Sequence, residues 1–98
     1  MPRKEIDPRI QAAATSYAAR FSNGTAGTAV AHFAAFHLDG DGVSARIEYD
    51  ERRARAWAYQ SGGECFAVQP SAGGKGATIA RIKPLTAAQW RAMLLGRR

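Results

Sequence analysis

Apolar and polar residues alternate in the middle of the chain, which predicts a half-buried β-strand at residues 43–50. Alternate side chains of a strand lie on opposite faces of a sheet, so the apolar set is expected to face the core. That set comprises Val43, Ala45, Ile47 and Tyr49. The run Asp39-Gly40-Asp41-Gly42 precedes this strand and is typical of a hairpin turn. Residues 28–38 are apolar nearly all round, so their spacing leaves helix or strand open. The hairpin chemistry favours a strand for at least residues 33–38.

A turn at residues 50–53 is expected to lead into a second strand at residues 54–60. In that register Ala54, Ala56 and Ala58 face inward opposite the apolar set and leave room for a covering helix. On the outer face, Glu48 would lie opposite Arg55 as an ion pair, and Arg46 opposite Trp57 as a cation–π pair. A further strand is expected at residues 64–69, which would pair Phe66 with Ala58 and Val68 with Ala56 on the inner face, and another at residues 77–83.

Capping residues predict one helix at each end of the chain. Asp7 before Pro8 is typical of a helix start, and Asn23-Gly24 is the expected stop. Thr86 and Gln89 form a capping box at the start of a C-terminal helix. Its inward-facing residues should be Trp90, Met93 and Leu94, and Gly96 should end it. The expected fold class is α+β: one domain over residues 1–98, with an antiparallel meander of four or five strands flanked by the two helices.

Basic residues are concentrated in the second half of the chain. The 98 residues carry a net charge of +6, and residues 51–98 hold nine basic and two acidic side chains. A polyanionic partner is therefore expected, although a basic surface also serves to keep a protein solvated. The chain contains no apolar run long enough to span a bilayer, so no membrane partner is expected. The one cysteine, Cys65, agrees with a reducing compartment, and the expected location is the cytoplasm.

The chain matches known catalytic and metal-binding motifs poorly. In the loop at residues 73–78, Gly76-Ala77 separates Lys75 from Thr78, which departs from a phosphate-binding loop. Residues 39–44 lack the ligands of a calcium loop. His32 and His37 are five residues apart and share no face of a strand or helix. A buried strand cysteine usually acts as a small apolar residue. We therefore expect no enzyme activity, no catalytic residues, no cofactor and no metal.

Basic residues interleaved with aromatic residues are the clearest functional pattern. Cations hold phosphates and rings stack on bases, so this pattern predicts a non-enzymatic module that binds nucleic acid, preferably single-stranded. The predicted binding residues are Arg46, Arg52, Arg53, Arg55, Trp57, Tyr59, Lys75, Arg81 and Lys83.

Two other roles fit the same residues. The aromatic residues could pack under residues 28–38 or form a homodimer interface. Alternatively, the arginines and aromatics could serve as hot spots of a small protein-binding inhibitor or adaptor. Phages and plasmids encode such inhibitors against host defence complexes that handle nucleic acid. If this chain is such an inhibitor or adaptor, its expected partner is an acidic or nucleic-acid-binding protein surface.

Overall fold

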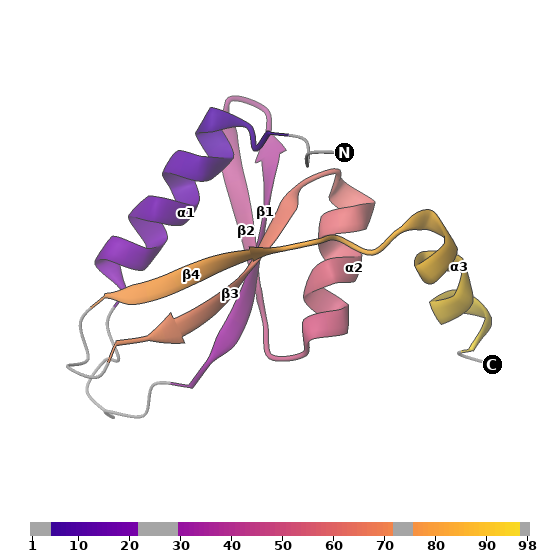
Figure 1. The fold of residues 1–98 in the computed structure, drawn as a ribbon. Helices are drawn as coiled ribbons and strands as arrows, with labels where there is room; N and C mark the ends of the chain where they lie inside the picture. The colour runs from indigo at the N-terminus through magenta and orange to yellow at the C-terminus, as the bar shows by residue number, and fades with distance from the viewer. Residues whose placement is uncertain (1–4, 22–29, 72–75, 97–98) are drawn as a thin grey trace.

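A computed structural model describes residues 5–21, 30–71 and 76–96 of the chain (Figure 1). The described elements follow in the order α1 (Pro8–Arg20), β1 (His32–Asp39), β2 (Gly42–Glu48), α2 (Glu51–Ser61), β3 (Glu64–Pro70), β4 (Ala77–Ile82) and α3 (Ala87–Leu95). The strands form one sheet in the order β2-β1-β3-β4, and every neighbouring pair is antiparallel. This arrangement confirms the α+β fold class, with a helix from each end of the chain beside an antiparallel sheet.

The first hairpin agrees with the sequence prediction. β1 includes the predicted strand at residues 33–38, and a two-residue turn joins it to β2. Gly40 has a φ of +62° in that turn, a conformation that glycine adopts without steric cost. The pairing of Asp39 with Gly42 closes the hairpin and places Phe36 opposite Ala45 and Ala34 opposite Ile47.

The strand predicted at residues 54–60 is wrong, because this segment forms helix α2. The carboxylate of Asp50 accepts a hydrogen bond from the Arg53 N–H and so caps the helix start. Gly62 ends the helix with a φ of +71°. Ala54 and Ala58 fit both periods, because residues four apart also lie on one helical face. Ala56, predicted on the same inner face, lies on a different side of the helix. Alanine and arginine favour helix where packing permits either structure.

Helix α2 carries the chain from β2 to β3, so that β3 pairs with β1 and β4. The predicted pairing of Phe66 with Ala58 and of Val68 with Ala56 is therefore wrong. Phe66 and Val68 instead pack with Ile10 and Ala14 of α1 in one core cluster.

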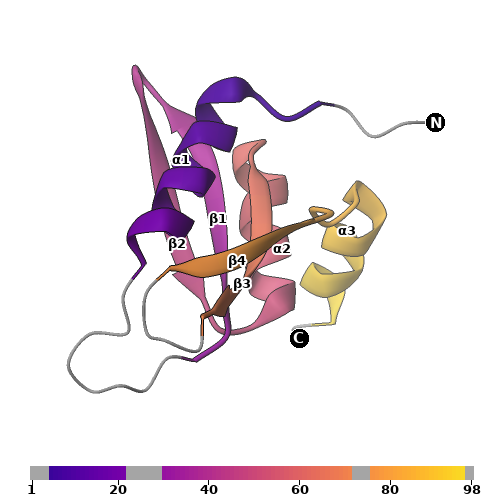
Figure 2. The ribbon, with the colours of Figure 1, turned by 60° about the vertical axis from the view of Figure 1, so that its left-hand side comes forward.

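Two helices cover opposite faces of the sheet (Figure 2). α1 covers the face that holds Phe36 and Phe66. α2 covers the other face, where Ala54 and Ala58 pack against Ala35 and Cys65. The expected role of Cys65 as a small buried apolar residue is confirmed, since its exposed fraction is 0%. α3 lies beside α2 rather than on the sheet (Figure 1).

The exposure of the side chains at the end of β2 and directly after it differs from the prediction. Ile47 and Tyr49, expected in the core, are 40% and 72% exposed, whereas Glu48, expected outside, is 9% exposed. β2 lies at the sheet edge, so α1 covers Val43 but does not extend over the later residues.

The predicted helix caps are confirmed at both ends of the chain. Asp7 caps α1. The helix ends at Arg20, earlier than expected, and the predicted stop at residues 23–24 lies outside the described residues. Thr86 and Gln89 form the reciprocal capping box of α3, and Gly96 ends it. Leu94, predicted to face inward, is 47% exposed. No helix in the described part of the chain is long and apolar enough to cross a membrane.

Candidate functional site

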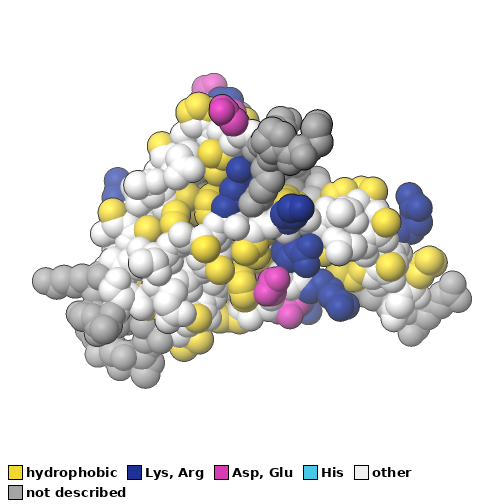
Figure 3. Space-filling model, viewed as in Figure 1, with side chains coloured by type: hydrophobic (Ala, Val, Ile, Leu, Met, Phe, Trp, Pro, Cys, Tyr) yellow, Lys and Arg dark blue, Asp and Glu magenta, His cyan; other side chains and the backbone are white. Residues whose placement is uncertain are grey.

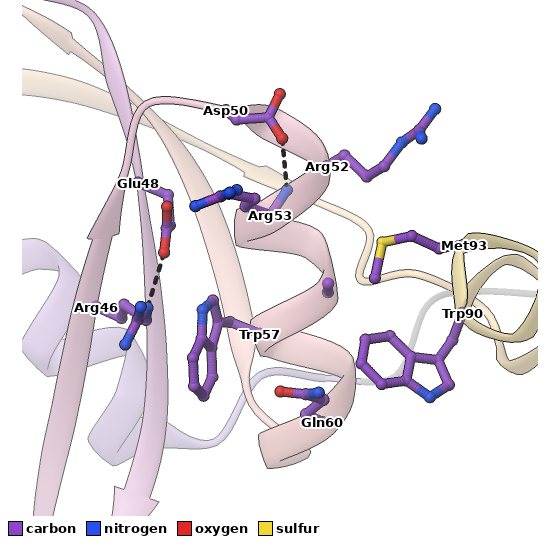
Figure 4. A pocket seen from close by; sticks show the side chains of 10 residues that line it. Arg46, Glu48, Asp50, Arg52, Arg53, Trp57, Gln60, Trp90 and Met93 are labelled. Carbon is purple, nitrogen blue, oxygen red and sulfur yellow. Dashed lines mark hydrogen bonds and ion pairs between the residues drawn. The ribbon is translucent and has the colours of Figure 1, made fainter. Parts of the chain in front are cut away.

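A groove of about 470 Å³ opens between β2, α2 and α3 (Figure 4). Both tryptophans of the chain line it, together with three arginines. We call it the Trp57 groove, and its lining residues are Arg46, Glu48, Asp50, Arg52, Arg53, Ala56, Trp57, Gln60, Trp90 and Met93.

A stacked arginine and tryptophan form the wall of the groove nearest the sheet. The Arg46 guanidinium carbon lies 4.0 Å from the centroid of the Trp57 ring. The Arg46 Nε donates a hydrogen bond of 2.7 Å to the Glu48 Oε2, which orients the guanidinium. The Arg46 side chain is still 51% exposed, against 11% for Glu48. One face of this cation is therefore held by the ring while the rest of it is accessible to a ligand.

The contact between Arg46 and Trp57 was expected, although for a different reason. The prediction placed both residues on paired strands, whereas the contact joins β2 to helix α2. The predicted ion pair of Glu48 with Arg55 is wrong, since Glu48 pairs with Arg46 within its own strand.

Two further arginines come from the first turn of α2. Arg52 and Arg53 are exposed, and within the described chain neither guanidinium has an ion-pair partner. The Arg53 side chain extends toward Glu48, whereas that of Arg52 points outward (Figure 4). Both stand at the helix N-terminus, whose dipole also attracts negative charge. Glu48 and Asp50 offset two of the three positive charges, so the groove residues carry a net charge of +1.

Helix α3 supplies the opposite wall of the groove. The Trp90 ring packs on Tyr59 of α2, with centroids 5.7 Å apart and planes inclined by 33°. Arg55 donates one hydrogen bond of 2.7 Å to the Lys83 carbonyl oxygen and another of 3.4 Å to the Gln89 Oε1. No described residue of α3 is fully buried. The Arg55 carbonyl oxygen also accepts a hydrogen bond of 3.1 Å from the N–H of Leu85, two residues before α3.

The structure gathers some predicted binding residues and separates others. Arg46, Arg52, Arg53 and Trp57 all line the groove. Arg55 and Tyr59 adjoin it and hold α3 in place, and Lys83 is exposed where the chain enters that helix. Figure 3 shows lysine and arginine side chains gathered where the sheet meets α3.

Arg81 does not belong to this site. It lies on the sheet face covered by α1, because it is two residues from Ile79 on the same strand and so shares the face of Ile79, which packs on the α1 cluster. Its Nε and Nη2 donate hydrogen bonds of 3.0 and 2.8 Å to the two carboxylate oxygens of Glu64. These hydrogen bonds raise the pKa of Arg81 above its ordinary range. Lys75 lies outside the described residues.

Three groove residues were absent from the predicted set: Gln60, Trp90 and Met93. Recognising α2 as a helix would have placed Gln60 beside Trp57, because residues three apart share a helical face. Trp90 and Met93 were predicted to face the core, and their spacing in the sequence does not indicate that they line a groove. They reach it through the contacts that bring α3 against α2.

The two histidines and the cysteine occupy separate places. The His32 Nε2 lies 2.7 Å from the Tyr17 hydroxyl on the α1 face. His37 alternates to the opposite face of β1. Among the described residues no three histidine, cysteine, aspartate or glutamate side chains lie close enough to hold a metal ion.

Comparisons of this chain with protein-family models, with curated proteins and with solved structures each found no match.

Proposed function

We propose that this chain is a non-enzymatic, cytoplasmic module that binds single-stranded nucleic acid in the Trp57 groove. The observation that carries the proposal is the stacked pair of Arg46 and Trp57 beside the exposed guanidiniums of Arg52 and Arg53. It needs no cofactor, since charge and ring surface supply both parts of the recognition.

Each component of the groove suits one part of a nucleotide. Aromatic rings stack on bases whatever their sequence, and such a contact is worth about 1–3 kcal/mol per base. Guanidinium groups bind phosphate oxygens with two parallel hydrogen bonds. An unpaired base offers its face to a ring, whereas a duplex keeps that face stacked, so the groove favours a single strand.

The test is titration of the full chain with fluorescently labelled single-stranded DNA and RNA of about ten nucleotides, read by anisotropy. Affinity should fall with salt at about −0.7 in log–log slope for each phosphate bound. Three groove arginines predict a total slope of about −2. Because both tryptophans of the chain line the groove, intrinsic tryptophan fluorescence should change in parallel with anisotropy.

A matched pair of double variants separates groove charge from overall charge. Arg52→Ala with Arg53→Ala should flatten the salt slope by more than one unit, because both cations lie at the groove. Arg9→Ala with Arg20→Ala removes the same charge from exposed positions of α1 and should leave the slope nearly unchanged. Equal losses from both pairs would contradict a groove-specific interaction.

A stacking variant tests the ring contribution. Trp57→Leu keeps an apolar side chain against the core cluster but removes the aromatic face. Binding should weaken by about 1–3 kcal/mol with little change in salt slope. The thermal midpoint of the variant, measured alongside, distinguishes lost stacking from lost folding.

The second candidate is a small protein-binding inhibitor or adaptor, such as mobile genetic elements encode. Two observations favour it: the groove residues carry a net charge of only +1, and Leu94 and Leu95 are exposed on α3, the helix that supplies one wall of the groove. Absence of nucleic-acid binding near 50 mM salt, where phosphate contacts are strong, would refute the first proposal and favour this one.

A further inference from the structure

The two edges of the sheet differ in what they expose. β2 and β4 are the edge strands. The exposed large apolar residues among the described ones include Ile47 of β2 and Tyr49 directly after it, and none from β4. An open strand edge with apolar side chains is a template for pairing with another strand. The β2 edge is therefore the stronger candidate for an interaction.

The hairpin turn determines which backbone groups of β2 are free. In a two-residue hairpin the closing residues, here Asp39 and Gly42, exchange both backbone hydrogen bonds, and bonded positions then alternate along the strand. The N–H and C=O groups of Val43, Ala45 and Ile47 consequently point away from β1. Three residues with six backbone groups are thus directed at the open edge.

The sequence of β2 is complementary to itself when it is paired antiparallel about its middle residue. The strand has seven residues and Ala45 is the fourth, so a twofold axis at Ala45 pairs all seven. Val43 of one copy then lies opposite Ile47 of the other, and Ala45 lies opposite itself. These side chains are on one face and form an apolar row, in which Val43 of the partner copy covers part of the exposed surface of Ile47.

The charges of β2 also permit this pairing in a chain with a net charge of +6. Arg46 and Glu48 neutralise each other at 2.7 Å within each strand. In the register centred on Ala45, Arg46 lies opposite Ser44 and Glu48 opposite Gly42, so no like charges face each other directly. Two copies would therefore approach along an edge that is locally neutral.

We propose that the β2 edge binds a second copy of this chain, forming an eight-stranded antiparallel sheet about a twofold axis at Ala45. A seven-residue ladder is smaller than a standard protein interface, so the dimer forms at high protein concentration. Because the axis is perpendicular to the sheet, both Trp57 grooves lie on the same face. Binding of one nucleic-acid strand in both grooves would rest on the proposed function, whereas the pairing of the two β2 edges does not.

The experiment is sedimentation equilibrium of the full chain, without nucleic acid, from about 10 μM to about 500 μM, a range that detects dissociation constants up to about 1 mM. The expected result is a monomer–dimer equilibrium. Ala45→Lys places two like charges opposite each other on the axis and should weaken dimerisation by about tenfold or more. Ala80→Lys, an identical change at an exposed position of the β4 edge, is the matched control and should leave it unchanged. Thermal unfolding of both variants reports that the fold is kept.

A cysteine cross-link tests the register. Opposed residues of a hydrogen-bonded antiparallel pair have Cα atoms about 5.5 Å apart, which a disulfide can bridge. Ala45→Cys should therefore give a covalent dimer on mild oxidation, and Ile47→Cys should give much less. A chain that stays monomeric at 500 μM, or a dimer that Ala80→Lys disrupts, would overturn the proposal. Preferential cross-linking through position 47 would also overturn it. Failure of nucleic-acid binding would leave these readouts unaffected.

Discussion

The corner between α2 and β3 depends on a glycine that has no room for a side chain. A Cβ atom on Gly63 would lie 2.0 Å from the Phe36 carbonyl oxygen and 2.9 Å from the His37 Cβ. Ordinary contact begins near 3.4 Å, so the corner and β1 would have to separate by about 1.4 Å. The neighbouring pair of Phe36 with Glu64 joins β1 to β3, and this separation would break it.

Gly63→Ala should therefore be strongly destabilising. Overpacking of this kind costs about 1–3 kcal/mol, and each lost backbone hydrogen bond adds about 1 kcal/mol. The expected total is about 3 kcal/mol or more, which for a chain of this size lowers the thermal midpoint by about 12 °C or more. Thermal unfolding followed by circular dichroism measures this effect.

The adjacent Gly62 is the matched control. Its φ of +71° strains any other residue, but a Cβ there would meet nothing within 4 Å. Gly62→Ala should cost about 1 kcal/mol, from backbone strain alone. If Gly62→Ala lowered the midpoint as much as Gly63→Ala, the close approach of this corner to β1 would be refuted.

Three further predictions concern stability. Thr86→Ala should cost about 1 kcal/mol through loss of the α3 cap, measured by urea unfolding. Ala58→Leu should cost about 1–3 kcal/mol by overpacking the cluster under α2, whereas Ala12→Leu, at an exposed position of α1, should cost little. The backbone hydrogen bond from Arg9, followed by the Arg9 side chain, lowers the pKa of Asp7 below its ordinary 3.8. The stabilisation that the ionised Asp7 carboxylate gives to the fold is therefore present above pH 3.8 and is lost as pH falls through the lowered pKa. Asp7→Asn should accordingly reduce the fall in thermal midpoint between about pH 4 and pH 2. A variant whose thermal midpoint falls as much as that of the unaltered chain over this range would contradict the prediction.

Local chemistry was sufficient to predict the starts of α1 and α3 and the first hairpin. The caps at Asp7 and Thr86 join groups within three residues of each other, so their pattern is visible along the chain. The same holds for the turn at Gly40. The hairpin turn indicated β1, whose own apolar run fits helix and strand alike, and β3 and β4 followed from apolar and β-branched residues between turn residues.

The tertiary structure alone decided the state of residues 51–61. Alanines at every second position fit a strand, yet two of them also lie one helical turn apart, and alanine is small enough to pack in either setting. Burial of Ala54 and Ala58 against Ala35 and Cys65 selects the helix. That choice then brings Trp57 to Arg46 across elements rather than along a strand pair.

The candidate site shows the same division. Residue type alone identified Arg46, Arg52, Arg53 and Trp57, because guanidinium and indole groups carry the relevant chemistry wherever they lie. Their common location depends on the packing of α2 beside β2, which brings Trp57 to Arg46. The contribution of Trp90 depends on the packing of α3 against Tyr59 and Arg55, residues about 30 positions earlier in the chain. Arg81 has the same chemistry, but the alternation of β4 places it on the opposite face of the sheet. Sequence by itself therefore determined which groups can bind, and long-range packing decided which of them share a surface.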